Sequence, residues 1–136
     1  MQTLIIAAAC LVNPQGQLLL VRKRGTTCFM LPGGKREPNE TPLQTLRREL
    51  NEELLLELPD SAFSHLGRFN AAAANEPDTQ IESEIFTAAL DQCVNPAAEL
   101  EALHWYHPDQ PDPLNLAPLL TKHVLPRLFL GYDKHQ

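Results

Sequence analysis

The sequence predicts an α/β fold in which helices cover both faces of a β-sheet. Two observations support this prediction. The first is a set of segments with the apolar patterns of strands, and the second is a pair of amphipathic helices, one between these segments and one after them. The strand-like segments span residues 4–12, 17–23, 65–71, 80–90 and 97–107, and the helices begin near residues 42 and 116. Elements in this order along 136 residues are expected to form a single domain, 1–136.

The first strand and the last helix have distinct patterns. Residues 4–12 form a continuous apolar run, which is typical of a strand buried on both faces. If that strand is exposed at one edge, it could pair with a second copy of the chain to give a homodimer. The last helix is expected over residues 116–130, and Pro126 should kink it. Its apolar face contains Leu116, Leu120, Val124 and Leu128.

Composition and charge limit the partners of this chain. Hydrophobic residues make up 43% and charged residues 21% of the sequence, as in ordinary soluble proteins. The formal net charge of −6 argues against a nucleic-acid polymer as partner, because such partners need a basic surface. The apolar N-terminal stretch lacks a basic start and is too short to span a membrane. Three widely spaced cysteines, Cys10, Cys28 and Cys93, are typical of reduced thiols, so we expect a cytoplasmic protein.

The most distinctive segment is residues 34–56, GKREPNETPLQTLRRELNEELLL, which contains a well-marked helix start. Thr41 can cap the helix, Pro42 suits its first position, and Gln44 completes a capping box. At 100° per residue, one narrow apolar stripe should pack on the core. The stripe consists of Leu43, Leu46, Leu50 and Leu54.

The opposite face of this helix carries Glu49, Glu52 and Glu53, an electrostatically unfavourable set. Like charges at these spacings each destabilise a helix by about 0.2–0.5 kcal/mol, and the helix dipole adds to the cost near the C-terminus. Arg48 can reach Glu52 one turn on, but one guanidinium does not neutralise three carboxylates. A hard divalent cation such as Mg²⁺ would. The alternative is a solvated acidic surface.

The spacing of the charged residues favours the metal. Gly34, Glu40 and the run Arg48-Glu49-Leu50-Asn51-Glu52-Glu53 follow the pattern G-x5-E-x7-R-E-U-x-E-E-x-G-U, where U is aliphatic. The segment therefore resembles the Nudix box. Leu55 occupies the position of the final glycine. Because a left-handed backbone costs a leucine about 1–2 kcal/mol, we expect the helix to run a residue or two further or to turn differently.

The resemblance implies the Nudix fold, an α/β/α sandwich with a central mixed β-sheet, and a MutT-like pyrophosphatase activity. Such hydrolases use Mg²⁺, with Mn²⁺ as an option, to cleave a nucleoside diphosphate linked to X, a small-molecule nucleotide, into a nucleoside monophosphate and phosphate-X. Glu49, Glu52 and Glu53 would hold the metal, joined by a carbonyl of Gly33 or Gly34. Glu49 or Glu52 would accept the proton of the attacking water, and Arg48 would position the carboxylates.

Further candidates lie outside the helix. The basic run Arg22-Lys23-Arg24 could contact phosphate, with Arg22 and Arg24 as the chosen candidates, or form a basic strand edge. Lys35 could reach a phosphate or be solvated. In the family, a loop before the last strand can add a carboxylate to the metal or act as base, which makes Glu99 and Glu101 candidates. The strands after the helix shape the leaving-group pocket in the family, and their candidates are His65, Arg68, Glu82 and Glu84.

Two other functions are compatible with the sequence. A Nudix-fold protein that binds nucleotides or regulates without catalysis would fit the loss of the glycine at Leu55. An unrelated protein that uses an acidic helix to bind a partner would have no metal affinity. The box residues concern only diphosphate and metal, so they do not identify the nucleotide.

Overall fold

The computed structural model describes residues 1–109 and 114–129. Its centre is a six-stranded sheet in which β4, β5, β1, β2 and β6 follow one another and β3 pairs with β1. The strands are β1 (Gln2–Val12), β2 (Leu18–Lys23), β3 (Gly33–Lys35), β4 (Ser64–Ala72), β5 (Thr79–Ala89) and β6 (Leu100–Tyr106). β1 and β5 run parallel, whereas the other pairs are antiparallel, so the sheet is mixed.

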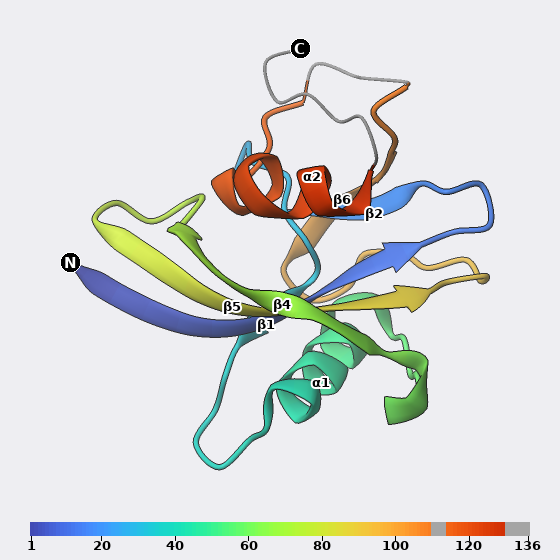
Figure 1. The fold of residues 1–136 in the computed structure, drawn as a ribbon, viewed down its shortest axis with the longest axis horizontal. Helices are drawn as coiled ribbons and strands as arrows, with labels where there is room; N and C mark the ends of the chain where they lie inside the picture. The colour runs from blue at the N-terminus through green and yellow to red at the C-terminus, as the bar shows by residue number, and fades with distance from the viewer. Residues whose placement is uncertain (110–113, 130–136) are drawn as a thin grey trace.

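Helices lie on both faces of this sheet (Figure 1). One face carries α1 (Pro42–Leu54), and the other carries the helical segment η2 (Leu120–Val124) that continues into α2 (Leu125–Leu128). A single 3₁₀ turn, η1 (Asp60–Ala62), precedes β4. This layering confirms the predicted α/β/α sandwich with a mixed sheet. No helix in the described part of the chain is long and apolar enough to cross a membrane.

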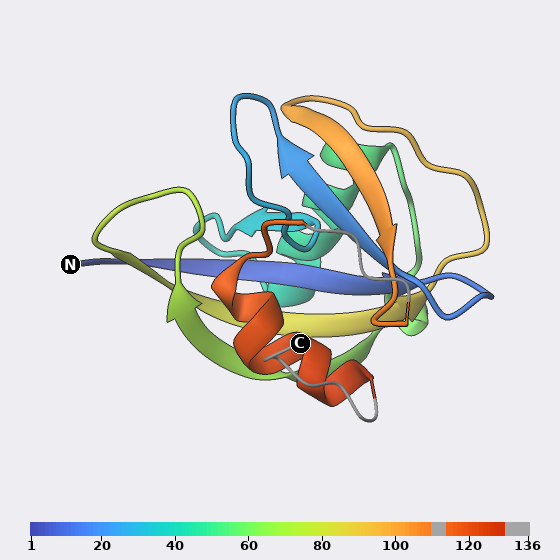
Figure 2. The ribbon, with the colours of Figure 1, turned by 90° about the horizontal axis from the view of Figure 1, so that it is seen from above.

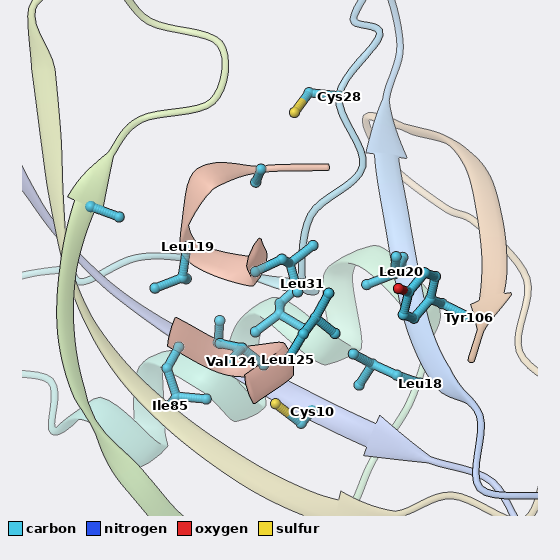
Figure 3. Packing of buried hydrophobic residues seen from close by; sticks show 14 residues of the cluster. Cys10, Leu18, Leu20, Cys28, Leu31, Ile85, Tyr106, Leu119, Val124 and Leu125 are labelled. Atoms are coloured by element: carbon cyan, nitrogen blue, oxygen red, sulfur yellow. The ribbon is translucent and has the colours of Figure 1, made fainter. Parts of the chain in front are cut away.

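The alternation of β1 divides the interior into two cores. Ala7, Ala9 and Leu11 pack toward α1, whose Leu46, Leu50 and Leu54 are buried as the predicted stripe requires. Ala8 and Cys10 point to the other face, where they pack with residues of η2 and α2. Figure 3 shows this second cluster, which includes Leu18, Leu20, Ile85, Val124 and Leu125.

The sheet corrects the expected basis for a homodimer. β1 pairs with β5 over residues 2–12, and its opposite edge pairs with β3 at Ile6–Ala8 and with β2 at Val12. β1 therefore lies between β5 on one side and β3 and β2 on the other. Figure 2 shows β1 crossing the middle of the molecule between these partners. The first strand is therefore not an edge strand of the sheet, and the homodimer itself stays a prediction.

The end of α1 also differs from expectation. The helix stops at Leu54, and Leu55 adopts the left-handed conformation with φ 53° and ψ 35°. Its N–H donates to the carbonyl oxygen of Asn51 at 3.0 Å. The expected extension of the helix was wrong: the leucine turns the chain at the position where the box has glycine. The next apolar residue, Leu56, then reaches the core and is 2% exposed.

Leu55→Gly is expected to stabilise the protein. The left-handed backbone costs a leucine about 1–2 kcal/mol, and glycine avoids this cost. The greater conformational freedom of glycine in the unfolded chain offsets part of the stabilisation. Because the Leu55 side chain is 76% exposed, its loss uncovers little core. We expect the free energy of unfolding to rise by about 0.5–1 kcal/mol in urea denaturation. Leu55→Ala, which keeps a Cβ, serves as control, and a less stable glycine variant would contradict this account.

The C-terminal helix is shorter than predicted. Leu116 lies in a β-bridge with Phe29 and not in a helix, and Leu130 lies outside the described residues. From Leu120 to Val124 the backbone is π-helical, with the N–H of Leu125 donating to the carbonyl of Leu120. Proline has no N–H and its ring clashes with a carbonyl one α-turn earlier. The wider π turn lies directly before Pro126 and relieves that clash, and the predicted kink at Pro126 stays a prediction.

Candidate active site

The site begins where β3 passes between β1 and α1. Gly33 has φ 149°, and a Cβ there would lie 2.2 Å from the carbonyl oxygen of Ala7. Only glycine allows this approach of two backbones. The N–H of Gly33 donates to Oε1 of Glu53 at 3.0 Å, so β3 fixes a carboxylate of the helix.

Gly34 places a second carboxylate. A Cβ at this position would lie 1.9 Å from Oε1 of Glu49, so the carboxylate occupies the space that a side chain would fill. β3 thus brings Glu49 and Glu53, one turn apart on α1, to neighbouring residues of a single strand. Gly33 and Gly34 therefore contact the carboxylates of Glu53 and Glu49, respectively.

Burial separates the three glutamates of the helix. Glu53 is 3% exposed, and its expected place opposite the leucine stripe was wrong, because at 100° per residue it lies only about 20° from Leu46, at the edge of that stripe. The Glu49 side chain is 15% exposed, whereas that of Glu52 is 55% exposed. β3 covers this edge of α1, where the N–H of Gly33, 20 residues earlier in the chain, donates to Oε1 of Glu53.

The buried acids are short of positive charge. Burial raises the pKa of Glu53 to about 8, although the N–H of Gly33 partly opposes this shift. Burial also raises the pKa of Glu49 to about 7, aided by its hydrogen bond with Glu52 and the charge of that residue. Each carboxylate would gain from a nearby cation, since opposite charge favours the ionised form.

The candidate donor atoms are all oxygens, the type of ligand that a hard divalent cation prefers. Glu49, Glu52 and Glu53 offer carboxylate oxygens, and the carbonyls of Gly33 and Gly34 are neighbouring oxygen donors; Mg²⁺ prefers such ligands. Within residues 1–109 and 114–129, no three acidic, histidine or cysteine side chains already form a metal-binding group. Oε1 of Glu53 accepts the backbone N–H of Gly33 at 3.0 Å.

Arg48 is held mainly by Glu40. Its Nε and Nη2 donate to the two Glu40 oxygens at 2.8 and 3.0 Å, and Nη2 also donates to the carbonyl of Lys35 at 3.0 Å. Nη1 lies farther from the box acids, 3.5 Å from Oε2 of Glu49 and 3.7 Å from Oε1 of Glu52. Arg48 therefore ties the loop before α1 to the helix and extends one N–H group toward the acid cluster.

Glu40→Gln is expected to lower stability at neutral pH and to flatten its dependence on acid. Hydrogen bonds from Arg48, then from the Glu37 backbone, lower the pKa of Glu40 to about 2. A carboxyl with a lowered folded pKa stabilises the fold above its unfolded pKa of about 4.5, and this contribution is lost as pH falls toward 2. Urea denaturation between pH 2 and 7 measures it, with exposed Glu57→Gln as control. A parallel pH profile for Glu40→Gln and the parent protein would contradict the assignment.

A cavity of about 500 Å³ opens beside these acids. Glu49, Gly33, Gly34 and Lys35 line it, as does Glu99. The structure therefore brings four metal or substrate candidates of α1 and β3 together with one from the loop before β6. Glu52 and Glu53 are not among its lining residues.

Lys23 is the residue of the basic run 22–24 that lines the cavity, although Arg22 and Arg24 were the candidates chosen from that run. Its Nζ lies 3.6 Å from Oε1 of Glu99, because Lys23 pairs with Leu100 across β2 and β6. Its position among three consecutive basic residues gave no means of choosing it. Strand alternation could have distinguished Lys23 from Arg22 and Arg24, because neighbouring side chains along a strand point to opposite faces.

The other basic and acidic candidates lie apart from the cavity. Arg22 is bound to Glu101 at 2.6 Å and to the carbonyl of Thr26 at 2.7 Å, so these two candidates neutralise each other. Arg24 is exposed, and its backbone N–H donates to the carbonyl of Glu99 at 2.9 Å. Neither arginine is among the residues that line the cavity.

The candidates on β4 and β5 form a separate group. Glu84 accepts hydrogen bonds from Arg68 and is paired with His65, and a cleft of about 230 Å³ lies beside Glu82, Glu84 and Arg68. This cleft faces the start of α1, near Pro42, so it belongs to a different part of the surface.

Comparisons with known proteins agree with the fold. A family model described as NUDIX domain matches residues 2–128. The MutT NUDIX hydrolase from Burkholderia pseudomallei is 23% identical, with a TM-score of 0.71 over 94% of this chain and 97% of that one. The Escherichia coli ORF135 protein is 25% identical, with a TM-score of 0.68 over 98% of this chain and 96% of that one.

A curated relative matches a shorter segment. An RNA pyrophosphohydrolase of Halorhodospira halophila is 44% identical over 50 residues, which make up 37% of this chain and 28% of that protein. The match thus spans less than a third of the relative's length.

Proposed function

Because the chain belongs to the NUDIX domain family, we propose that it hydrolyses a phosphoanhydride bond in a nucleoside diphosphate linked to X. The products would be a nucleoside monophosphate and phosphate-X, and the reaction would depend on Mg²⁺ or Mn²⁺. The supporting observation is that β3 contacts the carboxylates of the buried Glu53 and the partly buried Glu49, and that Glu49 lines a cavity of about 500 Å³. We treat residues 1–136 as one domain that carries this activity.

The chain's own residues would take distinct roles. Glu49 faces the cavity and is our choice for the group that accepts the proton of the attacking water, in preference to Glu52. Glu49, Glu52 and Glu53 would hold the cation with a carbonyl of Gly33 or Gly34. When bound, this cation would supply positive charge to the diphosphate and lower the pKa of water. Arg48 would position the helix end through Glu40 and Lys35.

Charge supports a requirement for local cations. The net charge of −6 repels a nucleotide at long range, so binding needs positive groups at the site itself. Lys23 and Lys35 are the basic side chains among the described residues that line the cavity. Both would contact the phosphate chain, with Lys23 exchanging its present partner Glu99 for phosphate.

A hydrolysis screen tests the function. The panel holds nucleoside triphosphates, oxidised triphosphates, nucleotide sugars, dinucleoside polyphosphates and ADP-ribose, each with Mg²⁺, Mn²⁺ or EDTA. We expect release of a nucleoside monophosphate from at least one class, and no turnover in EDTA. Turnover that EDTA leaves unchanged, or nucleotide binding without product throughout, would overturn the proposal.

The alternative function, a Nudix-fold protein that binds nucleotides without catalysis, was based on Leu55. Leu55 takes a left-handed conformation and is 76% exposed, so the substitution affects the turn after α1. Glu49, Glu52 and Glu53 precede this turn. The departure from the box therefore gives no support for a loss of catalysis.

A further inference from the structure

Two of the residues that line the cavity form an ion pair with each other. Nζ of Lys23 lies 3.6 Å from Oε1 of Glu99, and Glu49 lines the same cavity. The two side chains of the pair are 38% and 62% exposed, so a ligand in the cavity can reach both. One of the basic groups available to a phosphate therefore already has a carboxylate beside it.

The backbone fixes the positions from which these two side chains extend. The N–H of Arg24 donates to the carbonyl of Glu99 at 2.9 Å, which joins the end of β2 to the start of β6. The N–H and the hydroxyl of Thr26 both donate to the carbonyl of Lys23, at 3.1 and 2.8 Å. Figure 2 shows β2 and β6 side by side, as their pairing requires. Main-chain contacts thus hold the lysine and the glutamate near each other.

The loop before Glu99 is anchored to α1. The N–H of Ala97 donates to the carbonyl of Glu53 at 2.8 Å. The next residue, Ala98, takes the left-handed conformation with φ 52°, which is uncommon for residues other than glycine. Such conformations cost free energy and persist where the surrounding structure fixes them. The loop thus places Glu99 at the cavity that Glu49 also lines.

A β-bulge gives Lys23 and Arg22 separate acidic partners. The register of β2 against β6 shifts between these two residues, so that Glu101 is the extra residue of β6. Bulges change the direction of side chains and are common next to active sites. Arg22 is paired with Glu101 at 2.6 Å, and neither of them lines the cavity. The strand pairing therefore leaves Glu99 as the partner of Lys23 inside the cavity.

A phosphate at Lys23 would meet the negative charge of Glu99. An ammonium group is a compact charge, and the carboxylate at 3.6 Å offsets much of it. Like charges at such short separations repel each other, also near a protein surface. An incoming phosphate must therefore displace the carboxylate of Glu99 before it gains the full attraction of Lys23.

We propose that Glu99 competes with the phosphate chain of a ligand for Lys23 and so weakens the binding of anions in the cavity. That a phosphate chain reaches Lys23 rests on the proposed function, but the competition needs no reaction. Once the bond is hydrolysed, the same competition would favour release of the product phosphate. Loss of the Glu99 charge should therefore tighten anion binding in the absence of metal, an effect that a metal ligand or a base would not produce.

Calorimetric titration with inorganic pyrophosphate in metal-free buffer tests this competition. We expect Glu99→Gln to lower the Kd about 5-fold relative to the parent protein, the factor that corresponds to about 1 kcal/mol for an exposed ion pair. Glu101→Gln is the matched control, because it removes the same charge from the neighbouring ion pair outside the cavity, and it should keep the Kd within about 2-fold. An equal gain in both variants, unchanged or weaker binding in Glu99→Gln, or no binding of pyrophosphate to any variant would overturn the proposal.

A second background tests whether the effect depends on Lys23. Lys23→Gln alone should raise the Kd, and adding Glu99→Gln to it should then lower the Kd by less than about 2-fold, because no lysine remains to be released. Binding too weak to measure in both proteins with Lys23→Gln would likewise place the effect at Lys23. An equal gain from Glu99→Gln in both backgrounds would indicate general repulsion and overturn the competition. Tighter pyrophosphate binding by Glu99→Gln in a protein that hydrolyses no nucleotide of the panel would contradict the proposed function alone.

Discussion

Glu53→Gln is expected to lower metal-dependent hydrolysis on the order of 100-fold or more while leaving the fold intact. Changes to groups that merely orient metal ligands already cost about 10–100-fold, so loss of a carboxylate ligand should cost at least that much. The fold should survive because glutamine keeps an oxygen that can accept the N–H of Gly33, now 3.0 Å from Oε1. Glu52→Gln should behave alike, since its side chain is 55% exposed and supports little of the core.

The measurement combines kcat with Mg²⁺ binding and circular dichroism on each variant. Calorimetric titration with Mg²⁺ alone should show weaker binding in both variants, which separates loss of the metal from loss of substrate affinity. Glu57→Gln controls for the removal of one negative charge near α1. If Glu52→Gln and Glu53→Gln both keep parent rates and Mg²⁺ affinity, then α1 does not hold the metal.

The start of α1 could be predicted from local chemistry. Thr41 accepts the N–H of Gln44, and the Gln44 side chain accepts the N–H of Thr41, as the capping box requires. The leucine stripe was also predicted, because burial of one helix face depends on a period of 3.6 residues that the sequence displays. The positions of β1, β2, β4, β5 and β6 followed for the same reason, since alternation and apolar runs are local signals, whereas β3 over Gly33–Lys35 was not predicted as a strand.

Contacts between distant segments could not be predicted in this way. Periodicity places Glu53 at the edge of the leucine stripe of α1, but the contact of its carboxylate with the N–H of Gly33 depends on the passage of β3, which the pattern of α1 does not predict. The pairing of Arg22 with Glu101 and of Lys23 with Glu99 depends on the register of β2 against β6, a relation between residues nearly 80 positions apart. Within one basic run, Lys23 therefore lines the cavity, whereas Arg22 forms an ion pair with Glu101.

Gly34→Ala is expected to impair catalysis with little loss of stability, and Gly33→Ala to do the reverse. The added Cβ at Gly34 would meet the carboxylate end of Glu49, a flexible group that can move aside. The added Cβ at Gly33 would meet the backbone of Ala7 and Ala8 at 2.2 and 2.6 Å, where neither strand can yield without losing pairing. Its φ of 149° is also unfavourable for alanine.

The displacement of Glu49 should be costly for the reaction. Moving a reacting group by about 1 Å can lower a rate about 100-fold, so we expect that loss in kcat for Gly34→Ala. Thermal unfolding should show a nearly unchanged Tm for this variant and a clearly lower Tm for Gly33→Ala. A Gly34→Ala protein with parent kcat would contradict the role of Glu49 beside the cavity.

A double variant tests whether Gly34→Ala lowers kcat by displacing Glu49. If Gly34→Ala acts by moving the Glu49 carboxylate, then adding it to Glu49→Gln should lower kcat little further, because both changes remove the same function. If it acts elsewhere, for example on a carbonyl ligand of β3, the two losses should multiply. Since the glycine and the glutamate lie 15 positions apart in the sequence, non-additivity would link them through the contact that β3 makes with α1.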